Sequence, residues 1–377
     1  MSIFTKEEIL ELKNIKSVTL ENILSNYPNL KHLFLQRDKI RDKPIAINNL
    51  FKLNLLTLKM ITQENIITFL QNSEKFLDLQ FLLLDSCKIR VLQKKFYDFV
   101  NLTTLQITKN YGLKNVVFEK YKLQNLTNLN LSNNKMANVP ESIDNLINLQ
   151  VLFLSENNIV DVGEEIFNLA KLTKLDLSKN KIKKISDSIG NLQSLKELSL
   201  SKNKNLKKIP LSMSNLKQIE RLELINIGLE YFPRELCYFE KLRILYLDSN
   251  KLEMIPREIS NLTKLTFLSI SMNNLKSLPI EIKNNSNFHK FLIYENSYSE
   301  NLSLECEYYQ SRNFNKNLDN LPTNIKEIRL YTPSCKDINH YYYNKIIKIP
   351  FDCQLYIDNN IITEEMMYRL FHVSFYS

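Results

Sequence analysis

LQVLFLSENNIVDVGEEIFNLAKLTKLDLSKNKI, residues 149–182, contains one pattern of residues twice. Leu149, Leu152, Leu154, Asn157 and Ile159 form the first copy, and the second copy follows 23 residues later. The pattern reads L-x-x-L-x-L-x-x-N-x-L, and a period of about 20 to 29 residues is typical of a unit made of one short strand and a returning segment. A single copy cannot bury its leucines alone, so we expect successive copies to stack into a solenoid.

The same pattern recurs along most of the chain. From residue 126 to residue 288 its steps are 23 or 24 residues long, whereas the steps after Leu53 and Phe288 are longer and predict insertions. The first apolar residue of the pattern falls at Leu30, Leu53, Leu79, Leu102, Leu126, Leu149, Leu172, Leu195, Ile219, Leu242, Leu265 and Phe288. Weaker copies are predicted at Ile15, Val18 and Leu20, at Ile325, Ile328 and Leu330, and at Leu355, Ile357 and Asn360.

Each position of the pattern has a physical task. Side chains alternate along a strand, so Leu172, Leu175 and Leu177 are expected to point into the core while Lys174 and Asp176 point outward. An asparagine at the ninth position has donors and acceptors that can satisfy backbone groups of adjacent turns in a ladder. This position holds Asn134, Asn157, Asn180, Asn203, Asn250, Asn273 and Asn296, with Cys87 as an alternative in an earlier copy.

Apolar–proline pairs recur in the returning segments. They are Val139-Pro140, Ile209-Pro210, Phe232-Pro233, Ile255-Pro256 and Leu278-Pro279, and the last four prolines are 23 residues apart. Proline lacks an N–H and has a fixed φ, which suits a corner between extended and helical backbone. A short amphipathic segment, such as 259–262, is predicted to follow and return the chain.

This pattern resembles the typical intracellular class of leucine-rich repeats, which includes Ras-suppressor-like proteins, plant Ras-group proteins and many bacterial repeat proteins. The resemblance covers residues 123–299 closely and 15–122 loosely. It implies an α/β solenoid, a leucine-rich repeat horseshoe with a parallel concave β-sheet and short helical, 3-10 or extended segments on the convex side. It also implies a shared binding surface rather than a shared reaction.

Both ends of a solenoid need caps, because the outermost turns otherwise expose leucine. Residues 1–14 are predicted to contain an N-terminal capping helix that starts near Thr5, and 15–299 to form the solenoid, regular over 123–299 and degenerate over 15–122. Residues 300–377 are assigned to an insertion, degenerate terminal repeats and a C-terminal cap. The segment 298–320 is interpreted as a loop, and a capping helix is expected after Thr363 with Met366, Met367, Leu370 and Phe371 on one side.

Composition favours a cytoplasmic chain without a membrane span. There is no run of about 18 apolar residues, and the start MSIFTKEEILELKNIK lacks the apolar region of a signal peptide. The five cysteines are scattered and odd in number, which favours a reducing compartment. Four glycosylation sequons are present, at Asn101, Asn125, Asn261 and Asn301. Three of them are the N-L-T that opens a repeat, which explains them without secretion.

The net charge of +9 raises the question of nucleic-acid binding. Basic and acidic residues are interspersed at the outward strand positions, and such a surface is not the coherent basic stripe that displaces counterions from phosphates. A denser group of lysines in the returning segments is interpreted as a solvated face. That group is Lys181, Lys183, Lys184, Lys204, Lys207 and Lys208. The sequence predicts no specific nucleic-acid binding.

Signals for catalysis are weak. The four glycines are too far apart for a loop that cradles phosphate, and the four histidines have no spacing that suits a metal. Cys335 and Asp337 faintly resemble the cysteine–acid pair of bacterial ubiquitin ligases built on leucine-rich repeats, but only about 40 residues follow, far fewer than the catalytic domain of that family. We therefore expect no enzyme activity, cofactor or metal.

Apolar side chains at outward strand positions are the best candidates for a binding site, because most copies place small or polar groups there. What we call the C-terminal patch consists of Ile244, Tyr246, Phe267, Leu292 and Tyr294, bordered by Arg221, Glu223 and Asp248. A middle patch consists of Val151 and Phe153, and an N-terminal patch of Phe34, Leu55, Phe81 and Leu83. Alternatively, the segment 298–320 covers the C-terminal patch and a terminal cap covers the N-terminal one.

The leading functional hypothesis is a non-enzymatic scaffold that holds a protein partner on the concave sheet. By resemblance, a small GTPase, a kinase or a phosphatase complex is a plausible partner. The alternative is the substrate-recognition module of a ubiquitin ligase or of a secreted bacterial-type effector. The leucine–proline opening of an F-box is missing from residues 1–40.

Overall fold

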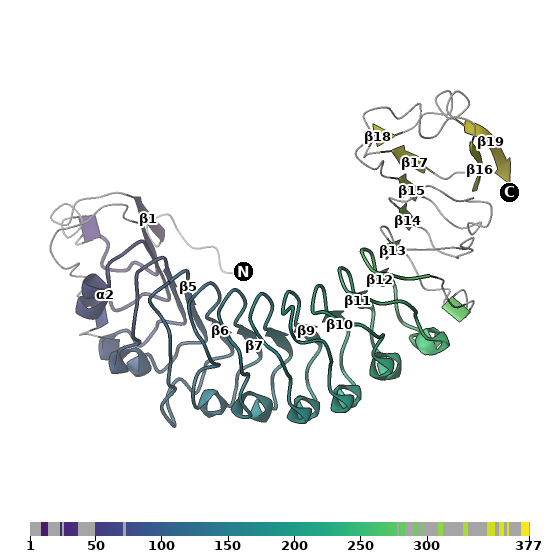
Figure 1. Cartoon of the computed structure of the whole chain (residues 1–377). Helices are drawn as coiled ribbons and strands as arrows, with labels where there is room; N and C mark the ends of the chain where they lie inside the picture. The colour runs from purple at the N-terminus through teal and green to yellow at the C-terminus, as the bar shows by residue number, and fades with distance from the viewer. Residues whose placement is uncertain are drawn as a thin grey trace. The chain divides into compact units, whose positions relative to one another are not determined.

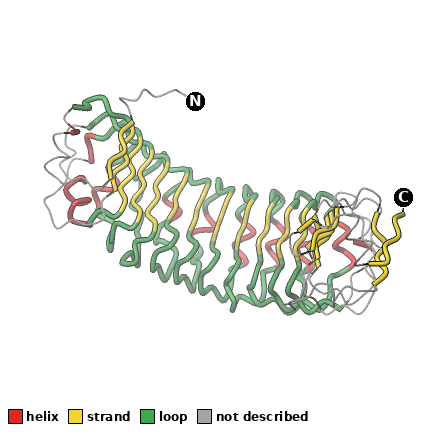
Figure 2. The backbone as a smooth tube through the Cα atoms, turned by 90° about the horizontal axis from the view of Figure 1, so that it is seen from above, coloured by secondary structure: helices red, strands yellow, loops and turns green. Residues whose placement is uncertain are grey.

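The computed structural model describes residues 9–13, 23–24, 26–36, 50–70, 73–276, 279, 281–282, 290–292, 296, 308–311, 327–330, 345–350, 354–357, 360–361 and 371–376. The chain divides into two compact units, residues 1–195 and 196–377. Within each unit, the strands lie side by side along one wall and the 3-10 segments run along the other (Figures 1 and 2). This alternation confirms the solenoid that the sequence predicts.

In the described residues of the first unit, eight strands pair in parallel. These are β1 (Ile9–Lys13), β2 (His32–Gln36), β3 (Leu55–Lys59), β4 (Phe81–Asp85), β5 (Thr104–Thr108), β6 (Asn128–Asn130), β7 (Val151–Phe153) and β8 (Lys174–Asp176). The returning segments hold helix α2 (Gln63–Leu70) and the 3-10 segments η1 (Ser73–Lys75), η2 (Lys94–Asp98), η3 (Ile143–Asn145), η4 (Glu165–Asn168) and η5 (Asp187–Asn191). Helix α2 occupies the long interval after Leu53, where the sequence predicts an insertion.

The second unit continues the pattern with strands β9 (Glu197–Ser199), β10 (Arg221–Glu223), β11 (Ile244–Tyr246), β12 (Phe267–Ser269), β13 (Lys290–Leu292), β14 (Tyr308–Ser311), β15 (Glu327–Leu330) and β17 (Gln354–Ile357), paired in parallel in that order. Strand β18 (Asn360–Ile361) pairs antiparallel with β17, and β16 (Lys345–Pro350) pairs with β19 (Phe371–Tyr376) in a separate sheet. The described 3-10 segments of the second unit are η6 (Leu211–Asn215), η7 (Arg234–Tyr238) and η8 (Arg257–Asn261).

The strand register places equivalent leucines of successive repeats side by side. Leu152 pairs with Leu175, and Leu222 pairs with Leu245. These side chains are at most 1% exposed, as are most inward leucines of the pattern. Each unit therefore has a continuous core made of stacked layers of leucine, and burial of that apolar surface is the main stabilising term.

The ninth-position asparagines form the predicted ladder. Asn157 Nδ2 donates to the carbonyls of Leu154 in its own turn and Leu131 in the preceding repeat, while its Oδ1 accepts from the N–H of Met136. Asn110, which occupies the same position one repeat before Asn134, belongs to the same series. A buried backbone group without a hydrogen-bond partner costs free energy. Each asparagine amide supplies a partner to two or three such groups.

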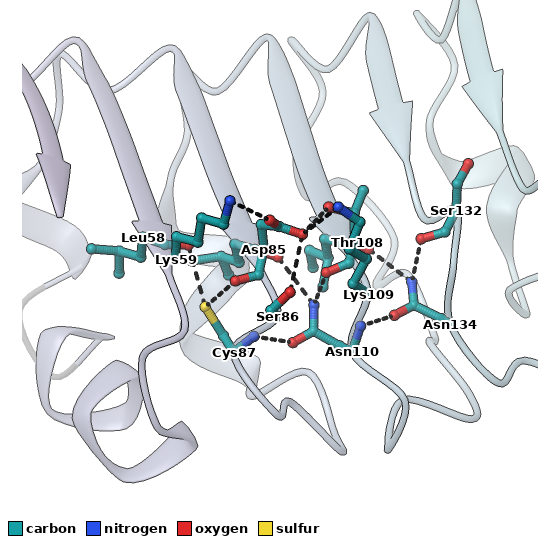
Figure 3. A network of polar contacts seen from close by, with 12 residues as sticks. Leu58, Lys59, Asp85, Ser86, Cys87, Thr108, Lys109, Asn110, Ser132 and Asn134 are labelled. Carbon is teal, nitrogen blue, oxygen red and sulfur yellow. Dashed lines mark hydrogen bonds and ion pairs between the residues drawn. The ribbon is translucent and has the colours of Figure 1, made fainter. Parts of the chain in front are cut away.

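Cys87 replaces asparagine in this ladder, and Figure 3 shows how. Its Sγ lies 3.3 Å from the carbonyl oxygens of Leu58 and Asp85, and its N–H donates to Asn110 Oδ1 at 2.8 Å. The thiol thus takes over the donor role of the amide. Beside it, the Asp85 carboxylate lies between Lys59 and Lys109, at 3.7 and 3.9 Å.

The periodic prolines lie where the returning segments begin. Pro210, Pro233 and Pro256 immediately precede η6, η7 and η8, and all three have extended backbone angles. The position needs no donor and a φ near −70°, which proline supplies. The prediction of a proline corner followed by a short helical segment is confirmed for these three repeats.

Two of the four sequons have a structural explanation. Asn101 Nδ2 donates to the Leu77 carbonyl at 2.9 Å, and Asn125 Nδ2 donates to the Val100 carbonyl at 3.0 Å. The threonines that complete these sequons, Thr103 and Thr127, donate to the carbonyl of the equivalent residue one repeat earlier. The N-L-T sequence is therefore a device that ties one repeat to the next.

The N-terminal capping helix is wrong for residues 9–13, which form strand β1. This strand pairs in parallel with β2, with Leu10 opposite Leu33 and Leu12 opposite Leu35. Residues 9–13 therefore occupy the sheet position next to β2 that the weak copy at 15–20 was expected to fill. Leu10 and Leu12 stand 23 residues before Leu33 and Leu35, and this spacing was the available signal.

Two expectations for the C-terminal part need correction. Tyr308–Ser311, inside the segment interpreted as a loop, form β14 between β13 and β15. Phe371 begins strand β19 rather than completing a helix, and the rest of that expected helix lies outside the described residues. The weak copies near Ile328 and Leu355 are confirmed, because these residues pair with each other in β15 and β17.

Candidate protein-binding site

The C-terminal patch lies on strands β10, β11 and β12 of the second unit. In each strand the middle leucine is buried, whereas its two neighbours point to the open face of the sheet and are partly exposed, Ser269 excepted. Ile244 stands opposite Phe267, and Tyr246 stands opposite Ser269. Parallel strands are about 4.8 Å apart, so these side chains form one continuous surface.

An aromatic pair forms the centre of the patch. The ring centroids of Tyr246 and Phe267 are 4.8 Å apart with planes tilted by 45°. On the other side of Tyr246, the guanidinium carbon of Arg221 lies 5.0 Å from the ring centroid. Such contacts favour one arrangement of the rings and the cation over others. Tyr246 thus has an aromatic ring on one neighbouring strand and a cation on the other.

Arg221 and Glu223 form an ion pair at the edge of this aromatic centre. Two nitrogens of the guanidinium, Nε and Nη2, lie 2.8 and 2.6 Å from Glu223 Oε1. Glu223 Oε2 accepts a hydrogen bond from Ser199 Oγ at 3.0 Å. Both oxygens of the carboxylate therefore have donors from the chain itself.

Asp248 borders the patch in a different environment. Its Oδ1 accepts hydrogen bonds from Ser269 Oγ and from the N–H of Ser271, which lies at 3.0 Å. Burial raises the pKa of the Asp248 carboxyl above its ordinary value, and these hydrogen bonds only partly oppose that effect. No lysine or arginine among the described residues forms an ion pair with it.

The other residues assigned to the patch are only partly placed. Leu292 belongs to β13, and its backbone is paired with Ser269. Tyr294 lies outside the described residues. The four residues of β14 continue the sheet beside β13, so they do not cover the patch.

In the register of the strands, only two residues of the N-terminal patch stand directly opposite each other. Leu55 stands opposite Phe81, whereas Thr57 separates Phe34 from Leu83. All four apolar side chains are partly exposed. Lys13 Nζ lies 5.9 Å from the Phe34 ring centroid, so β1 supplies a cation at this edge.

The middle patch is smaller. Val151 and Phe153 of β7 stand between asparagines of β6 and charged residues of β8. Lys174 Nζ lies 5.7 Å from the centroid of the Phe153 ring. A single ring partly covered by a lysine is a weaker candidate for a docking centre than the Tyr246–Phe267 pair.

A groove in the second unit was missed by the search for outward strand residues. It has a volume of 880 Å³ and lies beside the corner that carries Pro256. Tyr231 and Met254 line it and are 80% and 66% exposed. Each residue directly precedes a buried apolar residue that is followed by proline, and the 23-residue spacing of Tyr231 and Met254 was the signal available.

The described residues show little that suggests chemistry. They contain no group of three or more histidine, cysteine or acidic side chains arranged to hold a metal ion. Burial raises the pKa of the Cys87 and Cys237 thiols to about 12, so both are protonated at neutral pH and are poor nucleophiles. None of the helices that the structure describes has the length and apolar character needed to cross a membrane.

Comparisons of sequence identify the repeats. The family model described as a leucine-rich repeat region matches residues 121–235, and the model described as a leucine rich repeat matches residues 241–262. No curated protein sequence matches the chain.

Comparisons of structure give the same fold. A leucine-rich repeat protein of Leptospira interrogans matches with a TM-score of 0.65 and 23% identity, over 98% of this chain and 100% of the other. An internalin (InlF) of Listeria monocytogenes matches with a TM-score of 0.57 and 18% identity, over 85% and 86%. The leucine-rich repeat ectodomain of the Arabidopsis thaliana receptor kinase GASSHO1/SCHENGEN3, solved in complex with Casparian Strip Integrity Factor 2, matches with a TM-score of 0.56 and 18% identity, over 96% and 48%.

Proposed function

We propose that this chain, a leucine-rich repeat protein, binds a protein partner on the C-terminal patch and has no enzymatic activity. The partner would cover Ile244, Tyr246 and Phe267, with Leu292 and Tyr294 extending the contact. The observation that carries the proposal is the ordered Tyr246–Phe267 pair at outward positions of the sheet. Aromatic side chains that are partly solvated in the unbound protein gain most when a partner excludes water.

The charges around the pair support the same proposal. Arg221 and Glu223 hold each other in place, and a rigid charged border sets the orientation and association rate of a partner. The plant ectodomain gives a precedent, since its leucine-rich repeats were solved in a complex. A cytoplasmic partner such as a small GTPase, a kinase or a phosphatase complex fits the resemblance to the intracellular repeat class.

Pull-down with patch variants tests the proposal. Wild-type protein, Tyr246→Ala and Phe267→Ala would be used as baits beside Tyr238→Ala, which removes an exposed tyrosine from η7 on the other wall of the same unit. A partner retained by wild type and Tyr238→Ala, but lost from both patch variants, supports the C-terminal patch. A partner retained by all four contradicts it, and Tyr231→Ala or Phe81→Ala would then test the groove and the N-terminal patch.

A further inference from the structure

Acidic residues outnumber basic ones at the outward positions of β9 to β12, although the chain as a whole is basic and Lys290 of β13 stands opposite Phe267 in the register. Among the outward residues of β9 to β12 and their immediate continuation, the charged side chains are Glu197, Arg221, Glu223 and Asp248. Three carboxylates thus stand against one guanidinium in the region that carries the aromatic pair. The formal net charge of the whole chain is +9.

Arg221 cannot balance all of this charge. Its guanidinium is committed to Glu223 through two contacts to one oxygen and lies against the Tyr246 ring. Among the described residues the donors to Asp248 are neutral. Its Oδ1 accepts from the Ser269 hydroxyl and the Ser271 N–H, and the Ser271 side chain and the Asp248 backbone also lower the pKa of this carboxyl. Within the described part of the chain, no lysine or arginine forms an ion pair with this carboxylate.

A partly buried carboxylate without a cation is unfavourable in the unbound protein. The residues around Asp248 have already removed much of its water, and the desolvation cost is offset only if a charge of opposite sign arrives. Asp248 continues the strand of Tyr246 two residues later and bonds Ser269, the residue opposite Tyr246. A cation on Asp248 would therefore have its carbon stem beside the aromatic pair, and lysine and arginine stems pack well against apolar surface.

We propose that the partner seats a lysine or arginine side chain on Asp248, with the stem of that side chain against Tyr246 and Phe267 and apolar residues beside it. This inference rests on the proposed function and adds the chemistry of the partner: a protein segment with one basic anchor between apolar residues. An acidic segment is disfavoured, because it would meet Asp248 and the carboxylates of Glu197 and Glu223 on this face.

Selection from a random dodecapeptide library displayed on phage tests the inference. The targets are wild-type protein, Asp248→Asn, Tyr246→Ala and, as a matched control, Glu240→Gln, which neutralises an exposed carboxylate of the same unit. Asparagine at 248 keeps an oxygen that accepts from Ser269 and Ser271. We expect wild type and Glu240→Gln to enrich the same peptides, with a lysine or arginine next to an apolar residue, and Asp248→Asn and Tyr246→Ala to lose them.

Affinities of one enriched peptide then measure the contact. We expect Asp248→Asn, and replacement of the basic residue of the peptide by glutamine, each to weaken binding by about tenfold or more, and the two changes together to cost little more than either alone. Peptides that depend on Tyr246 but are acidic, or bind Asp248→Asn equally well, overturn the basic anchor and leave the proposed function standing. A selection that yields no Tyr246-dependent peptide counts against both.

Discussion

Tyr246 and Phe267 contact each other diagonally across two neighbouring strands. Tyr246 stands opposite Ser269 in the register and Phe267 stands opposite Ile244, yet the two ring centroids are only 4.8 Å apart. Diagonal neighbours are within reach of aromatic side chains, and the small Ser269 leaves room for the Tyr246 ring. The sheet thereby joins two repeats into one apolar centre.

The Tyr246–Phe267 pair should contribute much of the binding free energy but little of the free energy of unfolding. Tyr246→Ala and Phe267→Ala are each expected to weaken partner binding by about 2 kcal/mol or more, because they remove large rings from the centre of the contact. Melting should change little, since both rings are partly exposed and the leucines beneath them are untouched. Titration calorimetry and thermal melts of the same samples measure the two effects.

Tyr238→Ala is the matched control for that experiment, because Tyr238 is 61% exposed on η7. If Tyr246→Ala and Phe267→Ala bind the partner normally but melt at a lower temperature than wild type, the patch is structural and the site lies elsewhere.

Leu198 should be important for the stability of its neighbours. It is 1% exposed and pairs with Leu222 in β10. Leu198→Ala is expected to cost about 2–5 kcal/mol through lost burial and cavity formation. Because repeats depend on their neighbours, hydrogen exchange should show faster opening of β10 than of β15 in the same unit. Lys202→Ala, an exposed change in the same repeat, should leave exchange unaltered; equal protection of β10 in both variants would contradict the stacked core.

The asparagine ladder gives a third prediction. Asn157→Ala would leave the Met136 N–H without its side-chain acceptor, whereas the Leu131 carbonyl would keep its hydrogen bond from Asn134 Nδ2. An unsatisfied buried group costs about 1–3 kcal/mol, so the Met136 amide should exchange faster by a corresponding factor. Asn128→Ala, an exposed asparagine on β6, serves as the control. If both variants exchange alike, the ladder contributes little to stability.

Much of the fold could be predicted because its cause is local and periodic. Inward apolar residues recur every 23 or 24 residues in the repeats from β4 to β12, and a ladder asparagine accompanies them except in the repeats of β4, which has Cys87, and β10, which has Ile227. The capping helix predicted within residues 1–14 is wrong for residues 9–13, because an early threonine, several acids and apolar residues suit a helix as well as a strand. What decides their structure is pairing with β2, and such tertiary context overrides local propensity.

The repeat pattern does not predict strand β14, because pairing with neighbouring strands decides this structure too. Its sequence, Tyr308 to Ser311, contains no leucine, and the strand forms where β13 and β15 offer backbone partners on both sides. In the candidate site, alternation along each strand predicts which residues face outward. It does not predict that Arg221 pairs with Glu223, or that Ser269 donates to Asp248, because these contacts depend on side-chain conformations.

The net positive charge of the chain should not produce tight nucleic-acid binding. If it did, affinity would fall steeply with salt in proportion to the phosphates neutralised. We expect no binding tighter than about micromolar at physiological salt, the usual non-specific range. A gel-shift titration with duplex DNA and single-stranded RNA at two salt concentrations measures this. A tight, sequence-dependent shift would contradict the prediction, and Lys181, Lys183 and Lys184 would be the first residues to mutate.

Asp248 should make the second unit less stable as pH rises above the ordinary range of a carboxyl group. Burial raises its pKa in the folded chain above the ordinary 3.8, so between these two pKa values the folded state binds more protons than the unfolded state. Stability from this group is therefore present below 3.8 and is lost as pH rises through the folded pKa. Asp248→Asn, which removes the charge and keeps an acceptor for Ser269 and Ser271, should match or exceed wild type in melting temperature at about pH 7.

The advantage of Asp248→Asn should shrink as the pH falls through the raised folded pKa and should be lost below 3.8, where the wild-type carboxyl is protonated in both the folded and the unfolded states. Thermal melts of wild type, Asp248→Asn and the exposed-site control Glu240→Gln, recorded from about pH 3 to pH 8, measure the difference directly. A variant less stable than wild type at neutral pH and equal to it in acid would show that the ionised carboxylate is stabilised by the fold. That result would also remove the physical reason for a partner to bring a cation to Asp248.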